Sequence, residues 1–172
     1  MELVKKIFDC VSIYKLKSRM DNRGGLTYAY EDDVPGFEIK ETRVYTMPQK
    51  GTFFGIHYSD EATPFSKLVS VVQGSGMDYV VDLRKDSTTY LKWEAIELNA
   101  QNALTVLVPA GIGHAFLSLE DNTIQLFAIN KNGKDGHSKQ INYIDPQIGL
   151  KLEIPITQIS DYDLNAPLLE EN

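Results

Sequence analysis

The chain has 172 residues, and its hydrophobic content of 42% is enough for one domain with a sizeable core. Its formal net charge of -7 argues against nucleic acid or an anionic membrane surface as a partner, because both repel an acidic protein. Cys10 is the one cysteine, no stretch approaches the ~20 apolar residues of a membrane span, and the start lacks a signal-peptide pattern, so we expect a cytoplasmic protein.

The first distinctive region in chain order is the polar segment of residues 19–33, in which Gly24 and Gly25 predict a turn between short edge strands. Residues 51–58 follow as a largely apolar strand. A further strand is predicted at residues 67–72, and it ends at the Gly-Ser-Gly turn signal of residues 74–76.

A period-two alternation dominates the middle of the chain. In residues 77–84 the odd positions form an apolar face, whereas the even positions, apart from Val80, put charge on the other face. More strands are predicted at residues 104–108, 115–119 and 124–129. Short strands at this spacing, without helical patterns between them, indicate an all-β barrel or sandwich that occupies residues 1–172 as a single domain.

The end of the chain reads differently. Residues 159–169 place cap-forming side chains ahead of an apolar cluster, which predicts a short helix packed on the barrel. Pro167 limits the length of this helix, because proline cannot continue the backbone hydrogen bonding.

The chain has three histidines; His57 and His114 are each open to two interpretations, and His137 to one. His57 lies in an apolar strand, where a histidine is either a hydrogen-bonded core residue or a base oriented by a carboxylate. His114 follows a glycine-rich turn and is either a turn-end residue or a donor that faces a ligand at the mouth of the barrel. His137 lies in a polar loop, where we expect it to be solvated.

Lys67 and Asp163 are open to a plain and a chemical interpretation. Lys67 starts its strand, where a lysine usually extends along the surface; pointing inward, it would stabilise an enolate. Asp163 is either a helix cap or the carboxylate that orients His57.

Metal and phosphate motifs are missing from the sequence. A metal-binding cupin usually has two histidines one residue apart, but Tyr58 and Ser59 follow His57, so we expect no metal and no other cofactor. The glycines form neither a P-loop nor a dinucleotide fingerprint nor a nucleophile elbow.

Nine segments, in their order and spacing, resemble the dTDP-4-dehydrorhamnose 3,5-epimerase family. They are residues 21–24, which match the family's acidic-x-Arg-Gly turn, and residues 55–58, 67–69, 81–90, 92–93, 97–102, 108–116, 145–149 and 159–163. The resemblance covers roughly residues 50 to 170 and implies an all-β, cupin-type jelly-roll β-barrel with short peripheral helices, a homodimer that contains no metal. It also implies a nucleotide-linked sugar as the substrate.

The resemblance implies a role for four of these residues. His57 would be the general base and Asp163 its dyad partner, Lys67 would stabilise the enolate, and His114 would line the same pocket. The chemistry is coherent, because the base removes a proton α to the C4 ketone, positive charge holds the enolate, and a proton returns on the other face.

The chain departs from the family pattern where the family donates its proton and holds its nucleotide. The family's usual general acid, a tyrosine, falls near Gly133, and a second tyrosine is matched by Phe127. Phe54 replaces an arginine that meets phosphate, and Gly25 and Leu26 replace aromatic residues that pack on the nucleotide base.

Three side chains are candidates to compensate on the substrate side. Arg43 and Arg23 are candidates for the phosphate contact, and Tyr45 is a candidate hydroxyl from another direction. The leading hypothesis is therefore an epimerase of a nucleotide-linked 4-keto-6-deoxy sugar, with a 3-epimerase or a ketoisomerase as variants. A non-catalytic carbohydrate- or nucleotide-binding cupin and a metal-dependent dioxygenase cupin are the alternatives from other classes.

Overall fold

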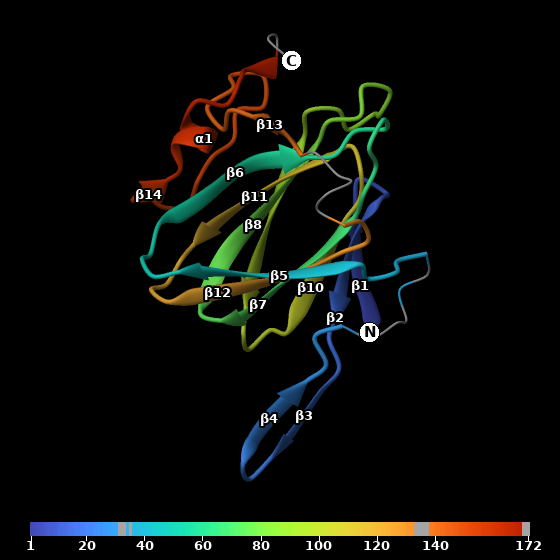
Figure 1. Ribbon diagram of the computed structural model, residues 1–172, viewed down its shortest axis with the longest axis vertical. Coiled ribbons are helices and arrows are strands. Elements are labelled where there is room, and N and C mark those ends of the chain that lie inside the picture. The colour runs from blue at the N-terminus through green and yellow to red at the C-terminus, as the bar shows by residue number, and fades with distance from the viewer. Residues whose placement is uncertain (31–33, 35, 133–137, 170–172) are drawn as a thin grey trace.

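The computed structural model describes residues 1–30, 34, 36–132 and 138–169 (Figure 1). Its strands form two facing sheets of the jelly-roll class rather than a closed barrel, with very little helix. The first sheet contains, in spatial order, β1 (Glu2–Ile7), β2 (Val11–Lys15), β10 (Leu104–Val108), β7 (Lys67–Gln73), β12 (Thr123–Ile129) and β5 (Glu41–Met47). The second contains β13 (Lys139–Ile141), β6 (Thr52–Tyr58), β11 (Ile112–Ser118), β8 (Ser75–Asp82) and β9 (Trp93–Asn99).

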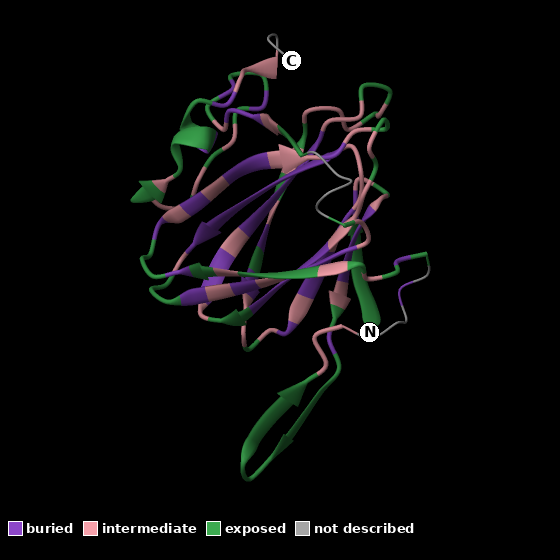
Figure 2. Cartoon of the chain, in the orientation of Figure 1, coloured by how far each residue is buried: buried purple, intermediate pink, exposed green. Residues whose placement is uncertain are grey.

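Three smaller elements lie outside this order. The hairpin of β3 (Ser18–Asp21) and β4 (Gly24–Thr27) projects from the body of the molecule, and Figure 2 shows that it is exposed throughout. The short strand β14 (Gln158–Ile159) pairs with β6 in parallel, whereas the other pairs are antiparallel. The single helical turn α1 (Asp161–Leu164) follows β14 at once.

The two sheets enclose the main core. Val69, Val80, Val106 and Phe116 come from strands of both sheets and are completely buried between them. A second apolar layer covers the outer face of the second sheet, where Tyr79, Val81 and Leu117 pack against the C-terminal segment of residues 143–169. The second sheet is therefore buried on both faces, which holds its inner side chains in fixed positions.

The predicted strands at residues 67–72, 104–108, 115–119 and 124–129 are confirmed as β7, β10, β11 and β12, with small differences at their ends. The turn with edge strands is confirmed as the β3–β4 hairpin, although residues 31–33 of the predicted segment lie outside the described residues. The predicted C-terminal helix is confirmed as α1. It ends after four residues, ahead of Pro167.

The alternation in β8 separates an apolar face from a charged face, but it does not show which of the two faces the other sheet. Asp78, Val80 and Asp82 are completely buried and face inward, while the apolar residues Tyr79 and Val81 face the C-terminal segment. A charged face is normally a solvated one. Here Asp78 is paired with a histidine and Asp82 with an arginine, which is what allows two carboxylates to be buried.

None of the helices in the described part of the chain is long and apolar enough to cross a membrane.

Candidate active site

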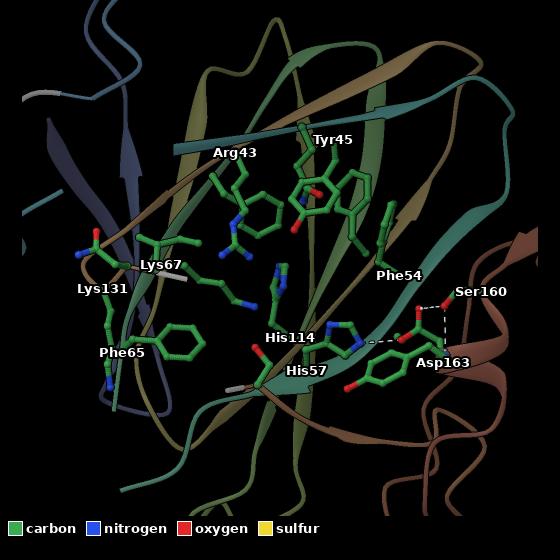
Figure 3. A pocket seen from close by; sticks show the side chains of 18 residues that line it. Arg43, Tyr45, Phe54, His57, Phe65, Lys67, His114, Lys131, Ser160 and Asp163 are labelled. Atoms are coloured by element: carbon green, nitrogen blue, oxygen red, sulfur yellow. Dashed lines mark hydrogen bonds and ion pairs between the residues drawn. The ribbon is translucent and has the colours of Figure 1, made fainter. Parts of the chain in front are cut away.

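A cavity of about 280 Å³ opens between the two sheets, next to the part of the C-terminal segment that carries Ser160, Tyr162 and Asp163 (Figure 3). The first sheet contributes Arg43 and Tyr45 from β5, Lys67 from β7 and Phe127 from β12, whereas the second contributes His57 from β6 and His114 from β11. Its volume is just below the ~300–1,000 Å³ range of ligand pockets, so it suits one sugar ring better than a whole nucleotide sugar.

His57 and Asp163 form a hydrogen-bonded pair on the second-sheet side of this cavity. The Nε2 atom of His57 lies 2.6 Å from Oδ1 of Asp163, across 106 residues of sequence. The imidazole is about one-third exposed, and the carboxylate is buried. A proton on Nε2 donates to the carboxylate, which leaves the lone pair on Nδ1, the nitrogen that faces the cavity in Figure 3.

The carboxylate of Asp163 is fixed from both sides. Ser160 caps α1: its Oγ accepts the backbone N–H of Asp163 at 3.1 Å and donates to Oδ2 at 2.9 Å. Gly55 lies on the other side, where a Cβ would be 2.9 Å from Oδ1 of Asp163. The glycine two residues before His57 therefore leaves the space that the carboxylate occupies.

The charge state of Asp163 follows from these contacts. Burial acts to raise its pKa, but the hydrogen bond and positive charge of His57, together with the Ser160 hydroxyl, outweigh it and hold the pKa below its usual range. The carboxylate is thus ionised at neutral pH and stabilises the imidazolium that forms when His57 accepts a proton.

Lys67 reaches into the cavity from the opposite sheet, where Figure 3 places it beside Arg43 and His114. Burial lowers its pKa to about 8, the charge of Asp78 opposes this shift, and the charge of Arg43 adds to it. Its ammonium lies 5.7 Å from the centre of the Phe127 ring. The group is therefore still mainly protonated at neutral pH and provides positive charge within the cavity.

His114 and Asp78 make a second, fully buried pair, with Nε2 2.6 Å from Oδ1. Burial lowers the pKa of His114 more than Asp78 raises it, and Lys67 lowers it further, so the ring is neutral. The other carboxylate oxygen of Asp78, Oδ2, has no hydrogen-bond partner among the described residues. The negative charge of Asp78 therefore acts mainly on His114 and Lys67.

Aromatic rings from both sheets close one side of the cavity, with Tyr45 and Phe127 from the first sheet and Phe54 from the second. The Tyr45 ring makes edge contacts with Phe54, at 5.2 Å between ring centres, and with Phe127, at 4.9 Å. Arg43 lies two residues earlier on the same face of β5. Its guanidinium pairs with Glu41, which is the main cause of its raised pKa, and Tyr45 contributes to the same shift.

The cavity thus brings together seven of the eight residues that the sequence indicates for the site. The exception is Arg23, which lies at the turn of the β3–β4 hairpin with its side chain 85% exposed and paired with Asp21. It does not line the cavity of this chain. Gly133, near the position of the family's general acid, and His137 lie outside the described residues.

Gln125, Lys131 and Tyr162 also line the cavity, and Asp78 pairs with His114 beside it, although no motif in the sequence indicates these four residues. Asp78 is one of the charged positions in the alternating strand β8, so the alternation marked it without revealing its direction. Gln125 and Lys131 lie on and just after β12 and line the cavity. Tyr162 contacts the edge of the His57 ring, at 5.9 Å between ring centres. Among the described residues no three histidine, cysteine or acidic side chains gather as metal ligands.

Comparison with known proteins gives consistent matches. The family model described as dTDP-4-dehydrorhamnose 3,5-epimerase matches residues 5–171. A dTDP-4-dehydro-6-deoxyglucose 3-epimerase of Streptomyces bikiniensis is 32% identical over 134 residues, which are 77% of this chain and 68% of that protein.

Two solved structures are similar over almost the whole chain. A 4-keto-6-deoxy sugar epimerase of Streptomyces spheroides superimposes with a TM-score of 0.90 at 25% identity, covering 99% of this chain and 88% of that one. A dTDP-4-dehydrorhamnose 3,5-epimerase of Bacillus anthracis, solved with TDP and pyrophosphate bound, does so with a TM-score of 0.87 at 27% identity, covering 98% and 99%.

Proposed function

Because the chain belongs to the dTDP-4-dehydrorhamnose 3,5-epimerase family, we propose that this sugar-nucleotide epimerase inverts a carbon next to the ketone of a nucleotide-linked 4-keto-6-deoxy sugar. The observation that carries the proposal is the His57–Asp163 pair, joined at 2.6 Å in a cavity that also contains a cationic lysine.

In the proposed reaction Nδ1 of His57 removes the proton α to the ketone. The carboxylate of Asp163 holds the ring in the required tautomer and stabilises the imidazolium. The ammonium of Lys67 stabilises the negative charge that develops on the ketone oxygen. A proton returned to the opposite face of the same carbon completes the inversion.

The nucleotide would lie outside the sugar cavity. Phe54 adds no charge at the cavity wall, whereas Arg43 and Lys131 line the cavity and supply positive charge for a diphosphate. Lys131 makes no ion pair with another described residue. The TDP and pyrophosphate bound to the Bacillus anthracis relative support a dTDP-linked substrate.

The proposal is tested by solvent-deuterium exchange. The enzyme is incubated in D₂O with dTDP-4-keto-6-deoxyglucose, and deuterium at C3 and C5 is measured by mass spectrometry and NMR. We expect exchange with wild type and a loss of about 10²-fold or more in His57→Ala. Tight binding of the nucleotide sugar without exchange would favour a non-catalytic binding protein, and equal slow exchange by both proteins would rule out His57 as the base.

The labelled carbon separates the variants within the class. Deuterium at C3 alone identifies a 3-epimerase, the activity in the name of the Streptomyces bikiniensis relative. Deuterium at C3 and C5 identifies a double epimerase, and movement of the ketone to C3 identifies a ketoisomerase.

We also propose that the enzyme is a homodimer and acts in the cytoplasm. The exposed apolar side chains of Met20 and Leu26 on the β3–β4 hairpin support a protein partner for this element. The unpaired thiol of Cys10 is what a reducing compartment favours.

A further inference from the structure

An epimerase needs a proton donor on the face of the substrate opposite its base. If a single base removed and returned the proton on one face, the configuration would be retained. His57 belongs to β6 of the second sheet, so the donor for inversion has to reach the carbon from the first sheet.

Tyr45 occupies that position. It lies on β5 of the first sheet and lines the cavity, and in Figure 3 its hydroxyl points inward from the wall opposite His57. The edge contacts with Phe54 and Phe127 hold its ring. Among the described residues that line the cavity, the other tyrosine is Tyr162, which contacts His57 itself and so approaches from the side of the base.

Arg43 lies beside the phenol of Tyr45. The two side chains emerge from the same face of β5, and their interaction is one of the contributions to the charge state of the guanidinium. A positive charge beside the hydroxyl stabilises the phenolate that remains after the proton leaves. The backbone pairing of β5 with β12 opposes Arg43 to Phe127 and Tyr45 to Gln125, which fixes both positions.

Lys67 also reaches the cavity from the first sheet, but its surroundings suit another task. The buried carboxylate of Asp78 lies near it and has an oxygen with no hydrogen-bond partner among the described residues. The charge of Asp78 opposes the effect of burial on the pKa of Lys67 and so favours the protonated form. At neutral pH Lys67 is therefore mainly protonated, and we assign its ammonium to the enolate oxygen.

Resting on the function proposed above, we propose that Tyr45 is the catalytic acid of this chain. After His57 has removed the proton from the α-carbon, the electron pair of the enolate re-forms the ketone, and the α-carbon takes the hydroxyl proton of Tyr45 on its opposite face. The products are the inverted keto sugar, a phenolate and an imidazolium, and solvent returns the two side chains to their starting states.

The test measures exchange and inversion separately. Tyr45→Phe retains the ring and its aromatic contacts but removes the proton. In D₂O with dTDP-4-keto-6-deoxyglucose, we expect the rate of inverted product to fall about 100-fold, while deuterium still enters the substrate with its configuration retained. Tyr58→Phe is the matched control, because Tyr58 follows His57 on β6 but lies outside the cavity, and both of its rates should equal those of wild type.

Several outcomes would overturn the assignment of Tyr45. They are inversion by Tyr45→Phe at the wild-type rate, an equal fall of exchange and inversion, and a selective loss of inversion in Tyr162→Phe instead. Absence of exchange in wild type would count against the proposed function itself. As a second measurement that retains a phenol, 3,5-difluorotyrosine at position 45 should shift the alkaline fall of the inversion-to-exchange ratio to lower pH, and an unshifted ratio would also overturn the assignment.

Discussion

At the scale of single residues, the His57–Asp163 dyad depends on Gly55, because this glycine has no side chain to occupy the space of the Asp163 carboxylate. Gly55 is in ordinary strand β6, and its backbone does not require glycine there. What requires it is Asp163, whose Oδ1 would lie 2.9 Å and Cγ 3.0 Å from an added Cβ. The position of the base is therefore encoded in part by a residue with no functional group.

Gly55→Ala is expected to disable catalysis without unfolding the protein. The methyl group displaces the Asp163 carboxylate from Nε2 of His57, and a misplacement of this size costs about 10²-fold in rate. Deuterium exchange and circular dichroism check the two parts of the prediction. In His57→Ala the same glycine substitution should add almost nothing, since both act on one unit; a full additional loss in the double variant would contradict this.

Lys67 predicts the alkaline limit of the reaction. Its pKa is lowered to about 8, so the ammonium loses its charge as pH rises through that value, and the rate of proton abstraction should fall with it. Lys67→Arg keeps the positive charge at all accessible pH values and should remove this limb, at some cost in rate from the larger group. Exchange rates from pH 6 to 10 provide the measurement, and a limb that stays near pH 8 in the variant would exclude Lys67 as its cause.

At the scale of elements, one buried carboxylate organises the loop between β8 and β9. Oδ2 of Asp82 accepts hydrogen bonds from Arg84 at 2.8 Å, Ser87 at 2.6 Å and Thr89 at 2.5 Å. Burial acts to raise the pKa of Asp82, but these donors outweigh it and leave the pKa far below its usual range. The family-like segment of residues 81–90 is thus explained as a structural anchor.

Asp82→Asn should destabilise the protein by about 3 kcal/mol, because it leaves Arg84 without its partner and weakens the loop. Asp86→Asn is the matched control on the same loop, where the exposed side chain should change stability by less than about 0.5 kcal/mol. Urea unfolding at pH 7 measures both. Since the folded pKa of Asp82 is depressed, its contribution is present above the unfolded value near 4 and is lost as pH falls, so the difference between wild type and Asp82→Asn should shrink in acid.

At the scale of the whole molecule, most of the strands were predictable because β-branched and aromatic runs lie between turn residues, with a period-two alternation in the sequence of β8. Strands β1, β2, β5, β9, β13 and β14 were not predicted from the sequence; β13 and β14 have only three and two residues. The dyad itself was reached through a family resemblance. Nothing local in the sequence pairs His57 with Asp163, because the pairing arises only when the C-terminal segment crosses the second sheet.

The sequence pattern also could not predict which face of β8 lies between the two sheets. Asp78 and Asp82 are buried because His114 and Arg84 meet them, and those partners come from a different strand and from the loop. For Arg23 the motif predicts a substrate contact that the structure of one chain does not contain, because the β3–β4 hairpin places this residue away from the cavity.

The exposed hairpin predicts how the oligomer should respond to mutation. If a second copy covers Met20 and Leu26, replacing both by serine should weaken the dimer about 10-fold or more, since roughly 2 kcal/mol of apolar burial is lost. Arg19→Ser, an exposed polar change on the same hairpin, serves as the control. Sedimentation velocity across a dilution series measures both, and a wild-type protein that is monomeric at every concentration would end the homodimer proposal.

The 106 residues that separate the two members of the dyad set an order of events during synthesis. A ribosome synthesises His57 106 residues before Asp163, so the strands of both sheets emerge before the carboxylate does. Until the final turn has left the exit tunnel and docked beside Gly55, a nascent chain holds a histidine with no carboxylate to orient it. The dyad is thus completed only after the strands that form the rest of the cavity have been synthesised.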